Sequence, residues 1–385
     1  MDKCEELEVW IKLWRVSGIG PKKFRLLLDY FDNPTAAFAA NTAQLTQAGL
    51  SQKDAENVTQ QKTNDDAAKP DLEWLNASDK HHIISLNCPE YPPRLKQIND
   101  APAILYVHGN LGILKDPQLG IVGSRNPTQS GHNNAYEFAK HLAQTGLCIT
   151  SGMALGVDGA AHQGAIDGKG PTIAVIATGI DRVYPAKHRE LAHKIAEQGA
   201  IVSEFPIGTH PDSRHFPRRN RIISALSYGV LVVEAALKSG SLITARLAME
   251  QNREVFAIPG SIHNPLAKGG HQLIRQGAKL VETAEDILEE MSGVIDLNDH
   301  VSSNKQSEMK NSNFSEERPP EEQQENNLDQ EQNQLLDAMG YDPISIDQLV
   351  VATDFDAASI AATLLILELQ NHVAGTGGGT YTRLK

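Results

Sequence analysis

The sequence predicts an α/β protein built around a Rossmann-like parallel sheet, with a helical domain before it and a winged-helix-like domain after it. Between residues 81 and 291, short apolar runs alternate with amphipathic stretches of helix length, a pattern typical of a parallel sheet with helices on both faces. The 385 residues exceed what one hydrophobic core usually serves, which predicts two or three domains. A composition of 40% hydrophobic and 22% charged residues fits folded domains.

Six apolar runs are the predicted strands of this sheet, at 119–122, 147–150, 172–177, 200–202, 229–233 and 254–258. Amphipathic segments such as 131–144 and 241–251 lie between them and are predicted helices. Right-handed crossovers would bring the loops that follow the strands to one edge of the sheet, where such folds bind ligands. The loops of this domain, residues 81–293, are therefore the first place to seek a function.

Residues 1–75 are predicted to form a helical domain, because apolar residues recur there at helical spacing in two stretches. The turn Gly18-Ile19-Gly20 separates the stretches and resembles a helix-hairpin-helix element. Its backbone N–H groups, with Lys22 and Lys23, can hold a DNA phosphate, and a purely structural role is equally consistent with the pattern. The polar segment 60–71 is predicted to be a linker.

The C-terminal part of the chain divides into a polar segment and a small domain. Residues 298–330 are acidic and low in complexity, which predicts a disordered linker. Residues 331–385 contain three apolar helical stretches and a glycine-rich hairpin, the pattern of a winged helix. Because the segment 357–373 has no lysine or arginine, we expect this domain to contact protein or regulate rather than grip DNA.

Charge and cysteine content restrict the class of protein. The formal net charge is −13, and the 3 cysteines lie far apart without metal-ligand spacing, which favours a reducing compartment. The acidic N-terminus lacks the apolar run of a signal peptide, and no stretch approaches about 20 apolar residues, so we expect a cytoplasmic protein without a membrane span. Phosphate-binding lysine loops, zinc motifs and nucleophile elbows are missing, so we predict no metal, no cofactor and no enzymatic activity.

Two strand-to-helix loops have the composition of anion sites. Gly123-Ser124-Arg125 follows one predicted strand, and Ser239-Gly240-Ser241 follows another. Backbone N–H groups at such turns, the dipole of the next helix and, at the first loop, the arginine favour a phosphate. For the first loop, an ordinary turn with a surface arginine is equally consistent. The glycine-rich loop 263–270, with Lys268, is a further possible contact.

The loop 150–162 carries a carboxylate and an imidazole four residues apart. Asp158 is placed as the N-cap of the following helix, and His162 lies on the same helix face. A helix cap with a packed histidine is favoured over a metal site or an acid/base pair.

The strongest chemical signal is the segment 214–221, and no acidic residue lies between Asp212 and Glu234. Arginines supply bidentate phosphate contacts, and an aromatic ring can stack a base at about 1–3 kcal/mol. This composition favours single-stranded nucleic acid over the alternative, a solvated helix start with Phe216 in the core. The candidate residues are Arg214, Phe216, Arg218, Arg219, Asn220 and Arg221.

Taken in order, these loops resemble the DNA-processing protein A family (DprA, also called Smf). The resemblance rests on Gly123-Ser124-Arg125, Ser151-Gly152-Met153-Ala154, Gly156-Val157-Asp158, Ala161-His162, Phe216-Pro217-Arg218-Arg219-Asn220-Arg221-Ile222-Ile223, Ser239-Gly240-Ser241-Leu242-Ile243-Thr244-Ala245 and Val255-Phe256-Ala257-Ile258-Pro259-Gly260. The flanking sterile-alpha-motif-like and winged-helix-like units also match the family's arrangement.

The resemblance implies a function and partners. Members of the family bind incoming single-stranded DNA during natural transformation, help to load a RecA-type recombinase onto it, work alongside single-strand-binding protein, and dimerise through the Rossmann-like domain. The residues that it places in the DNA groove are Arg125, Phe216, Arg218 or Arg219, Arg221, a lysine matched loosely by Lys187, and a basic residue matched loosely by Arg214.

Two other functions remain open from the sequence. A nucleotide-processing enzyme of the phosphoribohydrolase-like Rossmann class would use similar turns and a catalytic glutamate such as Glu250. A scaffold would use the acidic linker and the winged-helix-like domain as docking surfaces.

Overall fold

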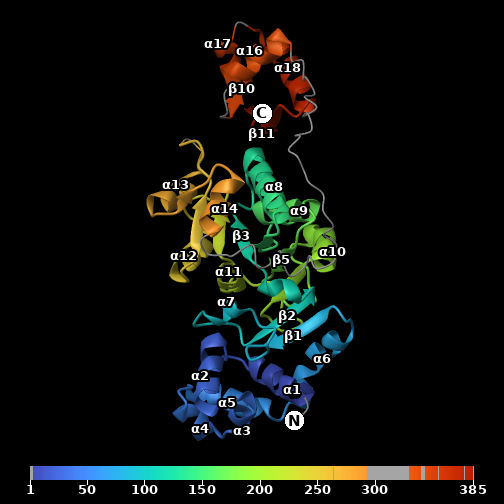
Figure 1. Ribbon diagram of the computed structural model, residues 1–385, viewed down its shortest axis with the longest axis vertical. Coiled ribbons are helices and arrows are strands. Elements are labelled where there is room, and N and C mark those ends of the chain that lie inside the picture. Colours follow the sequence, from blue (N-terminus) through green and yellow to red (C-terminus); the bar gives the residue numbers. More distant parts are fainter. Residues whose placement is uncertain are drawn as a thin grey trace, which may run out of the picture. The chain divides into compact units, whose positions relative to one another are not determined.

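The computed structural model describes residues 3–262, 264–292, 329–339, 343–353, 355–376 and 378–384. Its contacts group into two compact units, one of residues 1–127 and 131–297, the other of 128–130 and 298–385 (Figure 1). The predicted linker 298–330 lies, except for its last two residues, outside the described residues. The predicted helical and Rossmann-like domains together make up the first unit. Their boundaries stay predictions.

The first unit is built around one sheet of nine strands in the order β1-β2-β6-β5-β4-β3-β7-β8-β9. Strands β3 to β9 pair in parallel, whereas β1 and β2 add an antiparallel edge. The strands are β1 (His81–Ser85), β2 (Ile104–Gly109), β3 (Gln118–Val122), β4 (Cys148–Ser151), β5 (Thr172–Val175), β6 (Ala200–Ser203), β7 (Gly229–Val232), β8 (Glu254–Ala257) and β9 (Lys279–Leu280). The six predicted strands are confirmed as β3 to β8.

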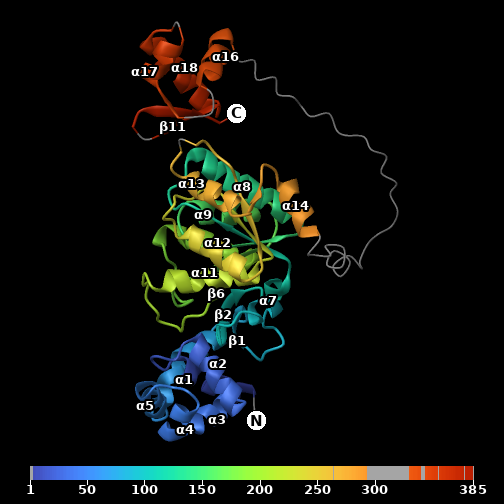
Figure 2. The same ribbon diagram turned by 90° about the vertical axis from the view of Figure 1, so that its left-hand side faces the viewer.

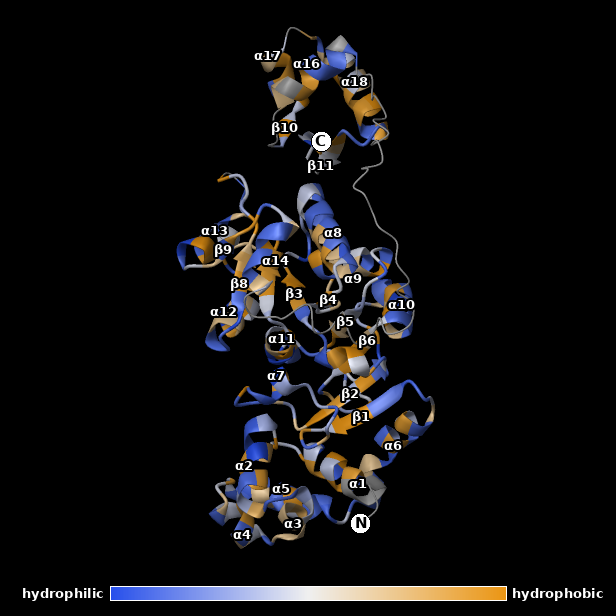
Figure 3. Cartoon of the chain, in the orientation of Figure 1, coloured by the Kyte–Doolittle hydropathy of each residue, from blue (hydrophilic) through white to orange (hydrophobic). Residues whose placement is uncertain are grey.

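Helices cover both faces of the sheet (Figure 2). One face carries α8 (Gln129–Gln144), α9 (Val157–Asp167), α10 (Arg189–Gln198) and α14 (Ala284–Ser292), and the other carries α7 (Pro93–Lys96), α11 (His215–Leu226) and α12 (Ser241–Glu250). Helix α13 (Lys268–Arg275) packs against β8. Apolar residues follow the strands, while exposed helix surfaces are polar (Figure 3). The parallel α/β fold is therefore confirmed.

Six helices precede the sheet: α1 (Lys3–Trp14), α2 (Pro21–Phe31), α3 (Pro34–Ala39), α4 (Thr42–Gln47), α5 (Gln52–Gln61) and α6 (Lys69–Asn76). Trp10 stacks on Phe24 at the centre of this bundle, with ring centroids 5.3 Å apart. The predicted linker at 60–71 is wrong, because a 3₁₀ turn (Asp65–Ala68) and the start of α6 occupy it. Ala67 and Asp71 are buried there, and a polar residue such as Asp71 gave no sign of its burial.

A buried carboxylate ties these helices to the sheet. Asp71 is fully buried and accepts hydrogen bonds from Arg15 Nε at 2.5 Å and from the Tyr106 hydroxyl at 2.7 Å. On the same side, Trp14 Nε1 donates to the carbonyl oxygen of Glu204 at 2.9 Å. These bonds fix the helical bundle against β2 and the loop that follows β6, which is the loop leading to α11. The bundle is thereby held near one candidate segment.

The second unit has the predicted three helices and hairpin: α16 (Gln330–Met339), β10 (Ile344–Ser345), α17 (Ile346–Ala352), α18 (Ala357–Leu369), β11 (Val373–Thr376) and β12 (Thr380–Arg383). Its three strands pair in the order β10-β12-β11, as in a winged helix. Among the described residues no single helix has the length and hydropathy of a membrane span, and only α17 and α18 taken together, across a sharp bend, reach them.

Candidate nucleic-acid interface

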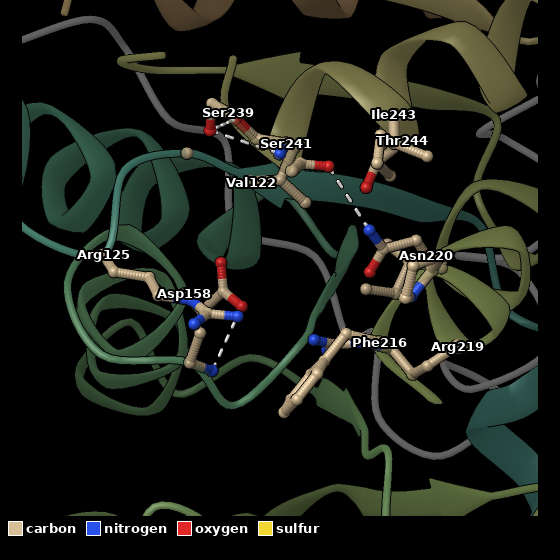
Figure 4. Close-up of a pocket in the computed structure, with 15 residues that line it drawn as sticks. Val122, Arg125, Asp158, Phe216, Arg219, Asn220, Ser239, Ser241, Ile243 and Thr244 are labelled. Atoms are coloured by element: carbon tan, nitrogen blue, oxygen red, sulfur yellow. Dashed lines mark hydrogen bonds between the residues drawn. The ribbon is translucent and has the colours of Figure 1, made fainter. Parts of the chain in front are cut away.

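A cavity of about 390 Å³ opens beside the C-terminal ends of β3 and β7 (Figure 4). Four segments surround it: the loop after β3, the loop between β4 and α9, the first half of α11, and the start of α12. The lining residues are Val122, Gly123, Arg125, Ala154, Asp158, Phe216, Pro217, Arg219, Asn220, Ile223, Ser239, Gly240, Ser241, Ile243 and Thr244. Four of the loops that the sequence singled out therefore meet at one place, and the loop 263–270 does not line it.

Arg125 and Phe216 form the open side of this cavity. The Arg125 guanidinium carbon lies 5.2 Å from the centre of the Phe216 ring, within the range of a cation–π contact. Arg125 is exposed and Phe216 is half-buried, so both remain available to a ligand. A smaller apolar pocket of about 90 Å³ also has Arg125 and Phe216 in its wall, and Tyr184 lies there, 6.1 Å from the Phe216 ring. A charge and an aromatic ring side by side suit a phosphate and its base.

Beneath them lies a buried pair of opposite charges. Arg219 is buried, and its Nη1 donates to the Val175 carbonyl oxygen at 2.8 Å. Asp158 is buried beside it and accepts from the Ala154 N–H at 3.1 Å. Burial raises the pKa of the Asp158 carboxyl and lowers the pKa of the Arg219 guanidinium, while each charge opposes the shift of the other. The pair gives the cavity a polar floor rather than a second exposed cation.

The sequence predicted Asp158 as the N-cap of α9, but Asp158 does not cap this helix. The N-cap is Gly156, and the Asp158 side chain turns back to the Ala154 N–H instead. The prediction failed because the helix begins two residues earlier than an Asp158 cap requires, at Val157, directly after a glycine with a positive φ.

Gly156 holds two of the cavity loops in contact. Its φ is +78°, and a Cβ there would lie 2.5 Å from the Ser124 carbonyl oxygen and 2.6 Å from the Arg125 carbonyl oxygen. Only glycine fits such a close approach of two backbones. The position of Arg125 therefore depends on this glycine.

Gly156→Ala is expected to lower the free energy of unfolding by about 2–4 kcal/mol, since left-handed strain of about 1–2 kcal/mol adds to the overlap with two carbonyls. Urea unfolding followed by circular dichroism measures it. Gly146→Ala is the control, because Gly146 has a φ of +96° but no atom within 4 Å of its added Cβ. An equal loss in both variants would show that the carbonyls yield and that strain alone matters.

His162 is a buried neutral residue. Its Nδ1 lies 2.8 Å from the Thr172 hydroxyl, and burial lowers its pKa to about 3. No cluster of metal-ligating side chains occurs among the described residues. The packed-histidine interpretation fits this geometry.

This burial predicts a pH dependence of stability. Between about pH 3 and 6.5 the unfolded chain binds a proton at His162 that the folded chain does not, so the folded state loses stability as the pH falls. At about pH 5 the cost is about 2 kcal/mol. The stability difference between the parent chain and His162→Gln should shrink by that amount between about pH 8 and pH 5. Urea unfolding at each pH measures it, and a constant difference would contradict the prediction.

The remaining predicted residues lie elsewhere. Arg218 and Arg221 turn to the buried carboxylate of Glu204, with Nη2–Oε2 distances of 3.6 Å and 2.5 Å. Arg214 is exposed and pairs with Asp212, whose pKa it lowers. The following residues are outside the cavity lining: Ser124, which accepts from the Asn126 N–H, Lys187 on the 3₁₀ turn Ala186–His188, Lys268 at the start of α13, and Glu250 at the exposed end of α12.

Helix N-termini contribute differently at the two predicted anion loops. Helix α12 begins at Ser241, directly at the cavity, whereas α8 begins only at Gln129, beyond the Gly123-Ser124-Arg125 turn. Ser239 and Ser241 hydroxyls lie 2.6 Å apart, and Asn220 Nδ2 donates to the Gly240 carbonyl oxygen at 3.4 Å. The sequence identified Asp158 as a helix cap, and Ile243 and Thr244 only as members of the Ser239–Ala245 segment, so it assigned none of these three side chains a role in the site.

Two family models match the chain. The model described as DNA recombination-mediator protein A covers residues 82–292, and that of the DprA winged helix domain covers residues 319–379. The chain belongs to the DNA recombination-mediator protein A family. The family resemblance and the winged-helix fold inferred from the sequence are confirmed.

Curated relatives of this family agree. Protein Smf of Escherichia coli (strain K12) is 42% identical over 287 residues, covering 74% of this chain and 75% of that protein. DNA processing protein DprA of Bacillus subtilis (strain 168) is 48% identical over 211 residues, covering 54% of this chain and 71% of that protein. A role in DNA processing follows for this chain.

Solved structures agree with the fold. DNA processing protein A from Streptococcus pneumoniae matches with a TM-score of 0.66 and 36% identity, over 74% of this chain and 97% of that chain. DNA processing protein A from Helicobacter pylori matches with a TM-score of 0.50 and 28% identity, over 58% of this chain and 97% of that chain. The Helicobacter structure concerns that protein's mode of binding single-stranded DNA.

Proposed function

We propose that this protein binds single-stranded DNA without sequence specificity at the Arg125–Phe216 side of the cavity. The observation that carries the proposal is the exposed guanidinium 5.2 Å from a half-buried aromatic ring, at the mouth of a cavity that also meets the N-terminus of α12. The guanidinium and the helix N-terminus attract phosphates, and the ring stacks a base of any kind. The single-stranded DNA binding of the Helicobacter pylori relative supports it.

A salt series with single and double strands tests this function. Fluorescence anisotropy with a labelled strand of about 20 nucleotides should show tighter binding than to the matching duplex, with little dependence on base composition. The logarithm of affinity should fall with the logarithm of salt by about 0.7 for each phosphate bound. A preference for duplex, or binding that ignores salt, would refute the proposal. A chain ending before residue 298 should keep the affinity, which separates this function from that of a scaffold.

The same proposal includes partners. The protein acts as a homodimer and is not an enzyme. It binds a DNA strand on one side of the first unit and transfers that strand to a RecA-type recombinase in the presence of single-strand-binding protein. The family membership supports this sequence of events. Recombinase filament growth on a strand coated with single-strand-binding protein should be faster with the parent chain than with an Arg125→Ala variant, and equal rates would contradict it.

One observation favours a nucleotide-processing enzyme as a second candidate. The cavity is of nucleotide size and contains the buried carboxyl of Asp158, whose raised pKa suits proton transfer. Glu250, the glutamate that this function would use, lies at the far end of α12 from the cavity. Release of free base from a nucleoside monophosphate, lost in Asp158→Asn, would establish the activity.

A further inference from the structure

We propose that the DNA strand continues from the Arg125–Phe216 cavity to a second phosphate site on the helical bundle, at the N-terminus of α2. This inference rests on the proposed single-stranded DNA binding and extends it to a part of the chain outside the residues 82–292 that the family model matches. The site is a second cavity, between the bundle and α11, and its wall combines a helix start with basic side chains.

The second cavity is an open groove of about 530 Å³ within the first unit. One wall is the turn and helix start of the bundle, and the other is the outer side of α11. The lining residues are Gly18, Gly20, Pro21, Lys22, Lys23, Asp100, Pro217, Arg218, Arg221 and Leu247. Four of these side chains are cationic and one is anionic. Lys23 is paired with Asp54, Arg218 and Arg221 are paired with Glu204, and Arg221 Nε also lies 3.5 Å from Asp100 Oδ2. Lys22 is the lining cation with no ion pair among the described residues, so it is the side chain that favours an anion here.

The helix start offers backbone donors to that anion. Gly20 is the N-cap of the 11-residue helix α2 and has no side chain to accept from the N–H groups of the first turn. Pro21 has no N–H, and the Phe24 N–H donates to the Gly20 carbonyl oxygen, so the available donors are the N–H groups of Lys22 and Lys23. A Cβ added at Gly20 would meet no atom within 4 Å, so a phosphate can approach the backbone there. Lys23 is held by Asp54 at 2.7 Å, whereas Lys22 is exposed at the groove.

The opposite wall contains a buried donor without a partner. Arg221 is 5% exposed, binds Glu204 through Nη2 and lies 3.5 Å from Asp100 Oδ2 through Nε, but its Nη1 has no hydrogen-bond acceptor among the described residues. A buried guanidinium N–H without an acceptor is costly. Arg221 lines the groove, so an anion there would lie near this guanidinium, whose charge Glu204 and Asp100 already balance in part.

The two cavities meet at the start of α11. Pro217 lines both of them, with Phe216 and Arg219 on the side of the first cavity and Arg218 on the side of the second. A strand that stacks a base on Phe216 can therefore pass over this turn and place a later phosphate near Lys22. Arg218, whose side chain is 43% exposed, lies between the two sites.

The test compares strands of two lengths. Oligothymidines of about 6 nucleotides should fill the first site alone, and those of about 24 should reach both. Lys22→Ala should lower the affinity for the long strand about three- to fivefold, reduce its salt slope by about 0.7, and leave the short strand unaffected. Gly20→Ala adds a methyl group in open space at a backbone angle that alanine adopts, and should weaken the long strand by obstructing the phosphate.

Lys194→Ala is the matched control, since Lys194 is exposed on α10, on the other face of the sheet. If Lys22→Ala binds both lengths like the parent chain, the second site is refuted while the proposed function stands. If Lys22→Ala weakens binding of the short and the long strand equally, or if Lys194→Ala loses the same affinity, the effect is a general one of charge, and the second site is also refuted. A parent chain that binds neither length would instead refute the proposed function.

Discussion

Replacing Arg125 and Phe216 together with alanine is expected to weaken binding of single-stranded DNA at least tenfold. The change removes one phosphate contact, worth about 0.7 in the salt slope, and one stacking platform, worth about 1–3 kcal/mol. Arg125 is exposed and Phe216 is only half-buried, so the fold should survive the double substitution. Fluorescence anisotropy across a salt series measures both effects.

Arg219 is a poor choice for this experiment, although the sequence suggested it equally. Its guanidinium is buried beside Asp158, so removing it leaves a carboxylate uncompensated and changes stability together with binding. Arg275→Ala is the control for loss of one positive charge, because Arg275 is exposed at the end of α13 and lines no cavity described above. An Arg125/Phe216 double variant that binds as tightly as the Arg275 variant would place the DNA elsewhere.

The strands were predictable because β3 to β7 are continuous buried runs and β8 is buried after Glu254, which is the pattern of parallel strands in a sequence. The antiparallel edge was not. β1 begins with two histidines, and its pairing with β2 places His81 against His108, a polar contact without an apolar signal. The two-residue β9 is too short to leave a pattern. The run Ile104-Leu105-Tyr106-Val107 at the start of β2 is apolar and fully buried, so its composition does indicate a strand. Its antiparallel pairing with β1 and β6 is long-range, and local composition does not indicate it.

The site was predictable at the level of loops but not of side chains. The segment 214–221 looked like one arginine cluster, yet α11 divides it by helical spacing. Phe216, Arg219 and Ile223 face the first cavity, whereas Arg218 and Arg221 face Glu204. The spacing of three to four residues along the helix separates the two sets of side chains, but it does not indicate what each set contacts. The sequence around Glu204 does not indicate that its carboxylate is fully buried and forms ion pairs with two arginines.

The second prediction with a large expected effect concerns the buried carboxylate of Glu204. Arg221→Met is expected to lower the free energy of unfolding by about 3–5 kcal/mol, the usual cost of breaking a buried ion pair by removing one partner. The Arg221 side chain is 6% exposed and that of Glu204 is fully buried, with Nη2 and Oε2 2.5 Å apart. Arg218, at 3.6 Å, is the remaining cation near Glu204 and is too exposed to replace Arg221.

The pair also joins α11 to the helical bundle, because the Glu204 carbonyl oxygen accepts the Trp14 Nε1 hydrogen bond at 2.9 Å. Loss of Arg221 should therefore move the urea midpoint seen by tryptophan fluorescence together with that seen by circular dichroism. The double variant Arg221→Met with Glu204→Met removes both charges from the interior and should regain most of the loss. Arg218→Met, which leaves the buried pair intact, should cost less than about 1 kcal/mol. If Arg221→Met unfolds at the parent midpoint, the buried ion pair does not contribute to stability, and α11 is held to the bundle by apolar packing alone.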